Sequence, residues 1–295
     1  MSSIERAARI LKTVKDEEWR TLAALERIAT SYGSADRGRL SRSARLPQER
    51  VSFAVQELVK KGLAQRRGEG FALRQEGVEV MALRDYVKKD LIFALGPAIA
   101  KGKESDVYEA VTEEGTRYAL KFYKIGRTSF KQVRRRRQQE GGEIKNWVTA
   151  NYEAARKEYE ALKDLGGLSP SFPEVISYSR STVLSEQLTG VRLSQRPDLV
   201  DARSSEASVF EAMRKAYLVA ELINADLSEY NILTDGERVW LIDWPQAVRA
   251  NHPNASEYLK HDVEAVATFF RRAFDVEMEP AKALAYVRGE ASALE

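Results

Sequence analysis

The chain has 295 residues, a length that usually corresponds to two domains. Its 43% hydrophobic and 31% charged residues are typical of a globular protein and exclude collagen-like and low-complexity chains. The most apolar stretch, residues 91–100, is too short to cross a membrane, and the first residues lack the apolar core of a signal peptide. We therefore expect a cytoplasmic protein that does not use a membrane.

The residue types also restrict the chemistry. Cysteine is absent and only two histidines occur, which excludes thiolate metal sites and cysteine nucleophiles. Any chemistry must therefore use carboxylates, lysine, amides, hydroxyls or a hard metal ion. The formal net charge is +3, but residues 124–149 hold eight basic and only two acidic residues. This concentration of charge predicts an anionic partner for that segment.

The first 90 residues show a pattern of three helices, a hairpin and a further helix. Apolar residues recur at three- and four-residue steps in the helical stretches, and a Gly-x-Gly turn at residues 68–70 joins two short strands. This order predicts a winged helix-turn-helix domain over residues 1–90. The predicted elements are helices over residues 16–32 and 37–44, a helix between Pro47 and Gly62, strands over 63–67 and 71–74, and a helix over 76–89.

From residue 91 the pattern changes to short strands, with helices following later. This predicts a two-lobed α+β domain over residues 91–295, with an N-lobe at 91–185, a hinge at 186–192 and a C-lobe at 193–295. The predicted strands cover residues 92–94, 107–110, 118–122, 174–178, 182–185, 232–234 and 239–242, and the predicted helices cover 147–165, 205–223 and 255–274.

Two N-lobe motifs suggest a nucleotide site. The loop around Gly102 keeps only the middle glycine of the kinase pattern G-x-G-x-x-G-x-V, so by itself it is a weak signal, because most such loops are plain hairpin turns. Lys121 ends the stretch Tyr118-Ala-Leu-Lys121, which fits the kinase pattern V-A-I-K. Such a lysine pairs with phosphates and with a helix glutamate, for which we choose Glu158. The alternative is a surface lysine and a glutamate paired within its own helix.

The C-lobe motif is more specific. Asp226 is followed five residues later by Asn231, and Asp243 comes twelve residues after that, at the end of an apolar strand. This is the spacing of the kinase catalytic and metal loops. Asp226 would orient an attacking hydroxyl or accept its proton, and Asn231 and Asp243 would bind Mg²⁺. The alternative, a helix cap and a turn, does not explain why the motifs occur in this order after Lys121.

These motifs together resemble the RIO-type atypical serine/threonine protein kinases, in the winged-helix-bearing (Rio two-type), archaeal-like subfamily. The resemblance extends over about residues 10–275. It is carried by the stretches Gly102–Tyr108, Ala119–Phe122, Ile125–Phe130, Asp226–Asn231, Ile242–Gln246 and His252–Ala255.

The resemblance implies a monomeric enzyme that uses ATP and Mg²⁺ (or Mn²⁺) as a kinase or ATPase. It further implies a role in maturation of the small ribosomal subunit, with its precursor and rRNA as partners. In the family the γ-phosphate can pass to the metal-binding aspartate, here Asp243, and adenine is held by hinge backbone at Glu186 and Leu188. The implied ATP-binding residues are Gly102, Lys103, Glu104, Ser105, Val107, Lys121, Glu158, Glu186 and Leu188.

The chain departs from the family pattern before the catalytic aspartate. Asn224-Ala225 stand where members usually have His-Gly or His-Ala, and Trp244 replaces a phenylalanine. Two alternative functions remain. One is a catalytically weak scaffold that binds rRNA or the ribosome. The other is a small-molecule phosphotransferase, against which the winged helix and the stretch Ile125–Phe130 argue.

A basic contact surface and two phosphoacceptors complete the predicted site. The basic residues could contact nucleic acid or the ribosome, or they could simply form an ordinary solvated face. Thr128 and Ser129 are candidate phosphoacceptors, and the alternative for them is a plain flexible loop. The predicted contact residues are Lys60, Lys61, Arg66, Arg67, Arg127, Lys131, Arg134, Arg135, Arg136 and Arg137.

Overall fold

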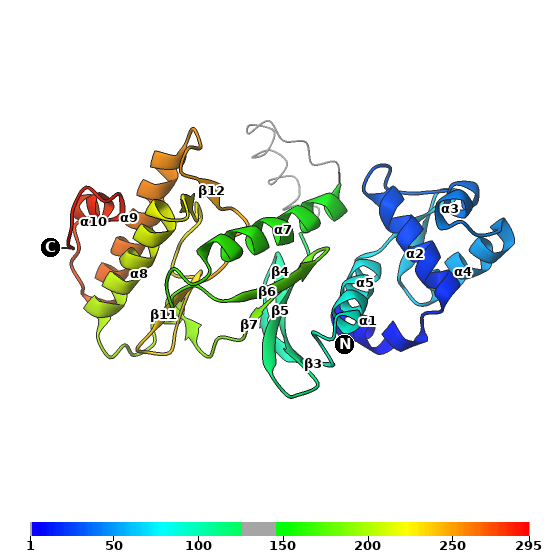
Figure 1. The fold of residues 1–295 in the computed structure, drawn as a ribbon, viewed down its shortest axis with the longest axis horizontal. Helices are drawn as coiled ribbons and strands as arrows, with labels where there is room; N and C mark the ends of the chain where they lie inside the picture. Colours follow the sequence, from blue (N-terminus) through cyan, green and yellow to red (C-terminus); the bar gives the residue numbers. More distant parts are fainter. Residues whose placement is uncertain (1, 126–145, 295) are drawn as a thin grey trace. The chain divides into compact units, whose positions relative to one another are not determined.

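The computed structural model describes residues 2–125 and 146–294. The chain divides into two compact units (Figure 1). Unit 1 comprises residues 1–155 and 178–184, and unit 2 comprises residues 156–177 and 185–295. The winged helix and the first strands of the kinase-like region therefore share one unit.

Unit 1 begins with five helices and a hairpin, and three antiparallel strands follow. Its elements are α1 (Ser3–Ile10), η1 (Leu11–Thr13), α2 (Asp16–Ala29), α3 (Arg37–Ala44), α4 (Gln48–Lys60), β1 (Ala64–Arg67), β2 (Gly70–Leu73), α5 (Gln75–Lys88), β3 (Ala94–Lys101), β4 (Ser105–Val111) and β5 (Arg117–Tyr123).

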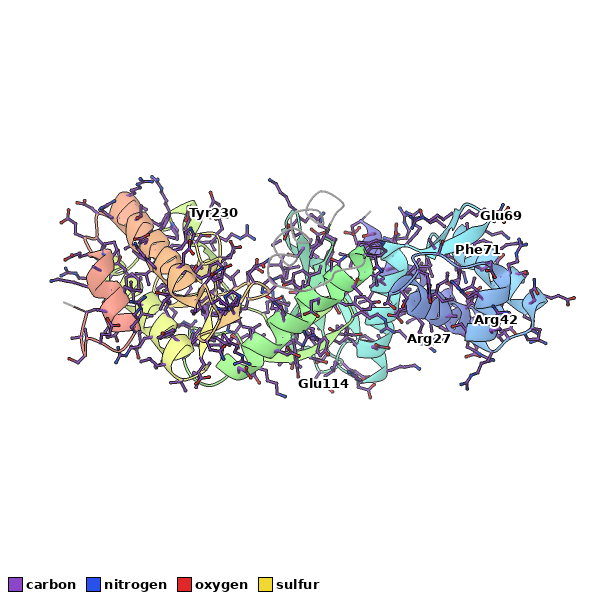
Figure 2. All side chains as sticks on the ribbon, turned by 90° about the horizontal axis from the view of Figure 1, so that it is seen from above. Arg27, Arg42, Glu69, Phe71, Glu114 and Tyr230 are labelled. Carbon is purple, nitrogen blue, oxygen red and sulfur yellow. The ribbon has the colours of Figure 1, made fainter. Side chains whose placement is uncertain are left out.

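The winged helix is confirmed, and the side chains explain it. Leu22, Leu25 and Leu58, on α2 and α4, are buried on the faces that their spacing predicts. β1 and β2 pair as an antiparallel hairpin, the wing, on which Figure 2 labels Glu69 and Phe71. Phe71 also pairs with Ala35, so the segment before α3 adds one isolated antiparallel bridge to the wing.

Helix α1 was not predicted, although its sequence contains a start signal. The Ser2 hydroxyl accepts the Glu5 N–H at 3.1 Å and the Glu5 carboxylate accepts the Ser2 N–H at 3.0 Å, which is a complete capping box. The helix therefore begins where a Ser-x-x-Glu pattern places it.

The kinase-like sheet has the order β3-β4-β5-β7-β6, with β6 at Val175–Ser179 and β7 at Thr182–Glu186. Residues of β4 alternate between buried and half-buried. Tyr108 and Leu120 pair on the buried face, and the Tyr108 hydroxyl donates to Ser2 Oγ at 2.8 Å. Val107 and Lys121 pair on the opposite face. The N-terminal segment thus contacts one face of the sheet at Tyr108, and Val107 and Lys121 of the predicted nucleotide site lie on the other face.

One strand prediction in this sheet was wrong. We predicted a strand at residues 92–94, but β3 covers Ala94–Lys101 and includes Gly96 and Pro97. The strand tolerates both because it lies at the sheet edge and its register shifts between Leu95 and Ala100. The predicted loop therefore shrinks to the residues after Lys101.

Unit 2 contains a helical core and two small sheets. In Figure 1 the C-terminal helices lie together, and large apolar side chains such as Phe210 and Phe270 fill the core between them. Helix α7 (Trp147–Leu165) runs from unit 1 into unit 2. The other elements are β8 (Val191–Arg192), η2 (Leu193–Gln195), α8 (Ala202–Leu218), β9 (Leu222–Ile223), β10 (Ile232–Thr234), β11 (Val239–Leu241), β12 (Val248–Arg249), α9 (Ala255–Phe274) and α10 (Pro280–Val287).

The helix predicted at residues 205–223 was wrong at its C-terminal end. Helix α8 ends at Leu218, and Leu222 and Ile223 form β9, which pairs with β12. Glu221 adopts a left-handed conformation (φ +54°), which no helix interior accepts. None of the described helices is both long enough and apolar enough to cross a membrane.

Candidate active site

The loop between β3 and β4 is a tight turn. The Gly102 N–H donates to the Ser105 carbonyl at 2.8 Å, and a Cβ on residue 102 would lie 3.0 Å from that oxygen. Glycine is therefore the residue that fits there without displacement. Lys103 and Glu104 are exposed at its tip, and Ser105 and Val107 are half-buried at the start of β4.

The chain just after β5 holds this loop in place. The Lys124 N–H donates to the Glu104 carbonyl at 2.7 Å, and Lys124 Nζ lies 2.7 Å from a carboxylate oxygen of the buried Asp106. Lys121, on β5, lies with its amine 4.9 Å from the centre of the Tyr123 ring. The loop and the lysine are thus parts of one strand pair.

The catalytic-loop motif lies in unit 2, between β9 and β10. In the antiparallel hairpin β10–β11, Ile232 pairs with Leu241, and the Ile242 N–H donates to the Asn231 carbonyl at 2.9 Å. This pairing places Asp243 beside the loop that carries Asp226. Asn231 Nδ2 closes that loop by donating to the Asp226 carbonyl at 3.0 Å. The structure therefore brings Asp226, Asn231 and Asp243 together on two adjoining loops.

Asn224 connects the two loops in place of the histidine usual in the family. Its Nδ2 donates to the Asp243 carbonyl at 3.1 Å, and its Oδ1 accepts the Asp226 N–H at 3.2 Å. Ala225 and Asp243 have left-handed backbones (φ +66° and +68°), which cost energy for residues other than glycine. The side chain of Asn224 helps to hold both loops in these conformations.

Asp262 on α9 is a site residue that the sequence analysis missed. Its side chain is buried, and its two oxygens accept the N–H groups of Ala225 and Leu227 at 2.8 and 3.0 Å, on either side of Asp226. Burial raises the pKa of Asp262 to about 6, and this outweighs the lowering by the two N–H donors. A carboxylate between Leu259 and Val263 on an apolar helix face was the signal available.

Trp244 anchors the chain after Asp243. It is buried, its Nε1 donates to the Leu241 carbonyl at 3.1 Å, and its ring packs edge-on against Phe172 at 5.7 Å. In contrast, Tyr230 of the catalytic loop is 58% exposed (Figure 2). The site therefore has a rigid base and a solvent-facing rim.

The remaining predicted ATP-binding residues lie in unit 2. Glu158 is buried on α7. Glu186 ends β7 and donates its N–H to the Glu174 carbonyl at 2.9 Å, and Leu188 follows in the segment before β8. Among the described residues, no group of three or more His, Cys, Asp or Glu side chains is arranged to hold a metal ion.

The predicted basic contact residues fall into three groups. Lys60, Arg66 and Arg67 are exposed on α4 and β1. Lys61 is only 19% exposed, because its amine contacts Glu18 at 2.5 Å and the Thr13 carbonyl at 2.8 Å, so it is part of the winged helix's own structure. The third group, Arg127, Lys131 and Arg134 to Arg137, lies outside the described residues, as do Thr128 and Ser129.

A sheet with a tight glycine turn and a lysine, followed by a helical part with an Asp-x4-Asn loop and a further aspartate, defines a protein-kinase-like fold, here with a winged helix in front. Profiles of two known families match the chain, "RIO domain" over residues 106–283 and "Rio2, N-terminal" over residues 11–89. The chain therefore belongs to the RIO family of serine/threonine-protein kinases, with the N-terminal domain of the Rio2 type.

Individual relatives support the same family assignment. The chain is 34% identical to the RIO-type serine/threonine-protein kinase Rio2 of Methanocaldococcus jannaschii over 78% of this chain and 87% of that one. It is 29% identical to the serine/threonine-protein kinase RIO2 of Caenorhabditis elegans, over 92% of this chain but only 52% of the longer relative. A crystal structure of the Chaetomium thermophilum Rio2 kinase–ADP/Mg²⁺–phosphoaspartate complex matches with a TM-score of 0.79 and 26% identity, covering 97% and 90% of the two chains.

Proposed function

We propose that this chain binds ATP with Mg²⁺ and cleaves its γ-phosphate. The observation that supports this best is the arrangement in unit 2, where the β10–β11 pairing and Asn224 place Asp226, Asn231 and Asp243 on adjoining loops. In this proposal Asp226 orients the attacking group or accepts its proton.

The residues present fit a magnesium ion. Mg²⁺ prefers hard oxygen ligands and is usually held by one or two protein side chains together with phosphate oxygens. Asn231 uses its amide nitrogen on the Asp226 carbonyl, so its amide oxygen is the atom that a metal would take. With the Asp243 carboxylate this makes a two-residue site. When bound there, Mg²⁺ neutralises charge on the β- and γ-phosphates.

The nucleotide itself would be held by the predicted ATP-binding residues. Backbone and side-chain groups of Lys103, Glu104 and Ser105 would hold phosphates beside Lys121, with Gly102 and Val107 shaping the loop and Glu158 pairing with the lysine. Because the Glu186 N–H is used on Glu174, its carbonyl would accept from adenine, and the Leu188 backbone would donate.

Asp243 is also the proposed acceptor of the phosphoryl group. The C. thermophilum relative was crystallised as a phosphoaspartate complex with ADP and Mg²⁺. In this chain a carboxylate oxygen of Asp243 would attack the γ-phosphorus, and the bond to the bridging oxygen would break to leave ADP. Water would then attack the phosphorus of the acyl phosphate, restoring the carboxylate and releasing inorganic phosphate.

The partner in this proposal is a precursor of the small ribosomal subunit in the cytoplasm. The resemblance and the strong positive charge of residues 124–149 support this. Residues 1–90 would act as a binding domain and residues 91–295 as the kinase domain. The second candidate function, a scaffold that binds rRNA with little catalysis, is supported by Asn224-Ala225, the departure from the family's His-Gly or His-Ala.

The deciding experiment measures ³²P-ATP turnover and protein labelling, with and without small ribosomal subunits. We expect Asp226→Ala to lower turnover about a hundredfold or more, and Asp243→Asn to abolish the hydroxylamine-sensitive label of an acyl phosphate. Hydroxylamine-sensitive label that persists in Asp243→Asn would disprove the role of Asp243 as acceptor. Salt-sensitive rRNA binding without turnover, even with subunits present, would instead identify the scaffold.

A further inference from the structure

Asn146, immediately before α7, connects two helices. Its Oδ1 accepts the N–H groups of Val148 and Thr149 at 3.0 and 3.2 Å, which makes it the N-cap of α7. Its Nδ2 donates to the carbonyls of Ala29 and Thr30 at 2.7 and 3.1 Å, at the C-terminal end of α2. One amide group thus satisfies backbone groups at the end of a winged-helix helix and at the start of α7.

A second contact joins the same helices farther along α7. The Tyr152 hydroxyl donates to Glu26 of α2 at 2.5 Å. Burial and the neighbouring Glu26 carboxylate raise the pKa of Tyr152, so this hydroxyl remains a donor. Tyr152 lies six positions after Asn146, which is about 9 Å along the helix axis. Contacts at two positions along α7 fix both its place and its direction relative to α2.

Glu26 also forms an ion pair with an arginine of the kinase-like sheet. Arg180, in the turn between β6 and β7, makes a two-pronged contact with Glu26 at 2.6 and 3.2 Å and also binds Asp85 of α5. The Arg180 side chain is 20% exposed and that of Glu26 is 15% exposed, so the pair is largely shielded from water. The contact between α2 and α7 is therefore fixed to the kinase-like sheet as well.

Helix α7 is also tied to the strand that carries Lys121. The buried Asn151 accepts the Ile125 N–H at 2.7 Å, just beyond the end of β5. Glu158 lies six residues past Tyr152 on the same helix. The winged helix, the lysine strand and the glutamate helix thus share one set of contacts.

We infer that the winged helix positions α7 for nucleotide binding, with Asn146 and Tyr152 as the positioning residues. This rests on the proposed function, because it assumes that Glu158 supports the phosphate-binding Lys121. Any partner that moves α2 would then change the affinity of the chain for ATP. The winged helix is in this sense a regulatory element of the kinase as well as a binding domain.

The test is a titration of full-length protein with a fluorescent ATP analogue and Mg²⁺. Asn146→Asp keeps the oxygen that caps α7 but removes the N–H groups directed at α2. We expect this variant to bind the analogue about fivefold more weakly or worse. Tyr152→Phe, which removes one hydroxyl, should act in the same direction and is the second variant if Asn146→Asp folds poorly.

Two controls separate positioning from a general loss of stability. Asp36→Ala removes the N-cap of α3, at 2.8 Å from the Arg39 N–H, without contacting α7, and should change affinity by less than about twofold. In a Glu158→Gln background, Asn146→Asp should have little further effect, because both act through one group. An equal loss in both backgrounds, or from Asp36→Ala, overturns the inference.

The two proposals fail differently in this experiment. If the wild-type protein does not bind the analogue, the proposed function is wrong. If the wild-type protein binds it and both Asn146→Asp and Tyr152→Phe bind it equally well, the positioning role is wrong and the proposed function remains.

Discussion

Asp262 shows how one buried carboxylate can set the geometry of a catalytic loop. It lies on α9 and receives two backbone N–H groups from the residues that flank Asp226. Removing it would leave two donors in a buried site, a situation that typically costs about 1–3 kcal/mol per group. The position of Asp226 therefore depends on a residue 36 positions later in the chain.

The raised pKa of Asp262 predicts a pH effect on stability. In the folded chain Asp262 binds its proton up to a pH of about 6, whereas in the unfolded chain it releases the proton near 3.8. Unfolding therefore releases this proton between those values, so the free energy of unfolding decreases as the pH rises. We expect the difference between wild type and Asp262→Asn to shrink by about 2 kcal/mol from pH 4.5 to 7.

Urea unfolding of both proteins at several pH values measures this effect. Subtracting the non-titrating variant removes the contributions of the buried Glu79 and Glu206, whose pKa values burial also raises, in each case to about 7. A difference that is independent of pH would contradict the prediction.

At single residues the motifs predicted which side chains come together better than they predicted which residues hold them in place. The spacing of Asp226, Asn231 and Asp243 was sufficient, because the hairpin that joins them is local in sequence. Asp262 is not part of any of these motifs, and only the packing of α9 brings it to the loop. The sequence also did not show that Lys61, a predicted contact residue, pairs with Glu18.

Among the elements, the β10–β11 hairpin matters most for the site. Its turn contains Gly236 in a left-handed conformation (φ +99°), and the Asp235 carboxylate accepts the N–H groups of Glu237 and Arg238 at 3.1 and 2.8 Å. These bonds, and the Arg238 side chain, lower the pKa of Asp235 to about 2, so it stays charged. The turn thus fixes the register that places Asp243 beside Asn231.

We expect Gly236→Ala to destabilise unit 2 by about 1 kcal/mol, because alanine is strained at this φ and its Cβ would lie 3.3 Å from the Asp198 carbonyl. Thermal unfolding followed by tryptophan fluorescence would show a lower midpoint. Gly115→Ala, at φ +88° with no atom near the added Cβ, is the matched control in unit 1. A larger loss from the control would show that packing at residue 236 is irrelevant.

Elements with regular periodicity were predicted most accurately. Helices α3, α7 and α9 begin and end at the predicted residues, and the apolar faces of α7 and α9 are continuous. Helix α3 buries only Leu40 and Ala44, and its bounds follow from the Asp36 N-cap and the left-handed Arg45 after it. The predicted C-terminal end of α8 was wrong because Leu222 and Ile223 continue an apolar run in the sequence. Their pairing with β12 is non-local and therefore not visible there. Short strands such as β8 depend entirely on such distant partners.

At the scale of the molecule, the winged helix and most of the kinase-like sheet belong to one compact unit. The buried Tyr86 hydroxyl lies 2.9 Å from Thr182 Oγ1, and Gln75 Nε2 donates to the Tyr123 carbonyl at 3.1 Å. The sequence predicted the two modules in the right order. It could not show their contact, since the contacting residues are 48 and 96 positions apart in the chain.

We therefore expect a fragment of residues 91–295 to aggregate, because it would expose the apolar face around Tyr108 and Leu120. Size-exclusion chromatography and light scattering of this fragment, compared with the full chain, measure the outcome. A monomeric fragment with native-like thermal unfolding would show that the winged helix contributes little to the stability of the sheet.

The edge strand β3 has a consequence for solubility. Edge strands expose backbone groups to which a strand of another molecule can add. Pro97 has no N–H, and the register shifts between Leu95 and Ala100 bend the strand there, so no flat, regular row of donors is presented. The irregularity that made this strand hard to predict thus protects the protein from joining its copies edge to edge.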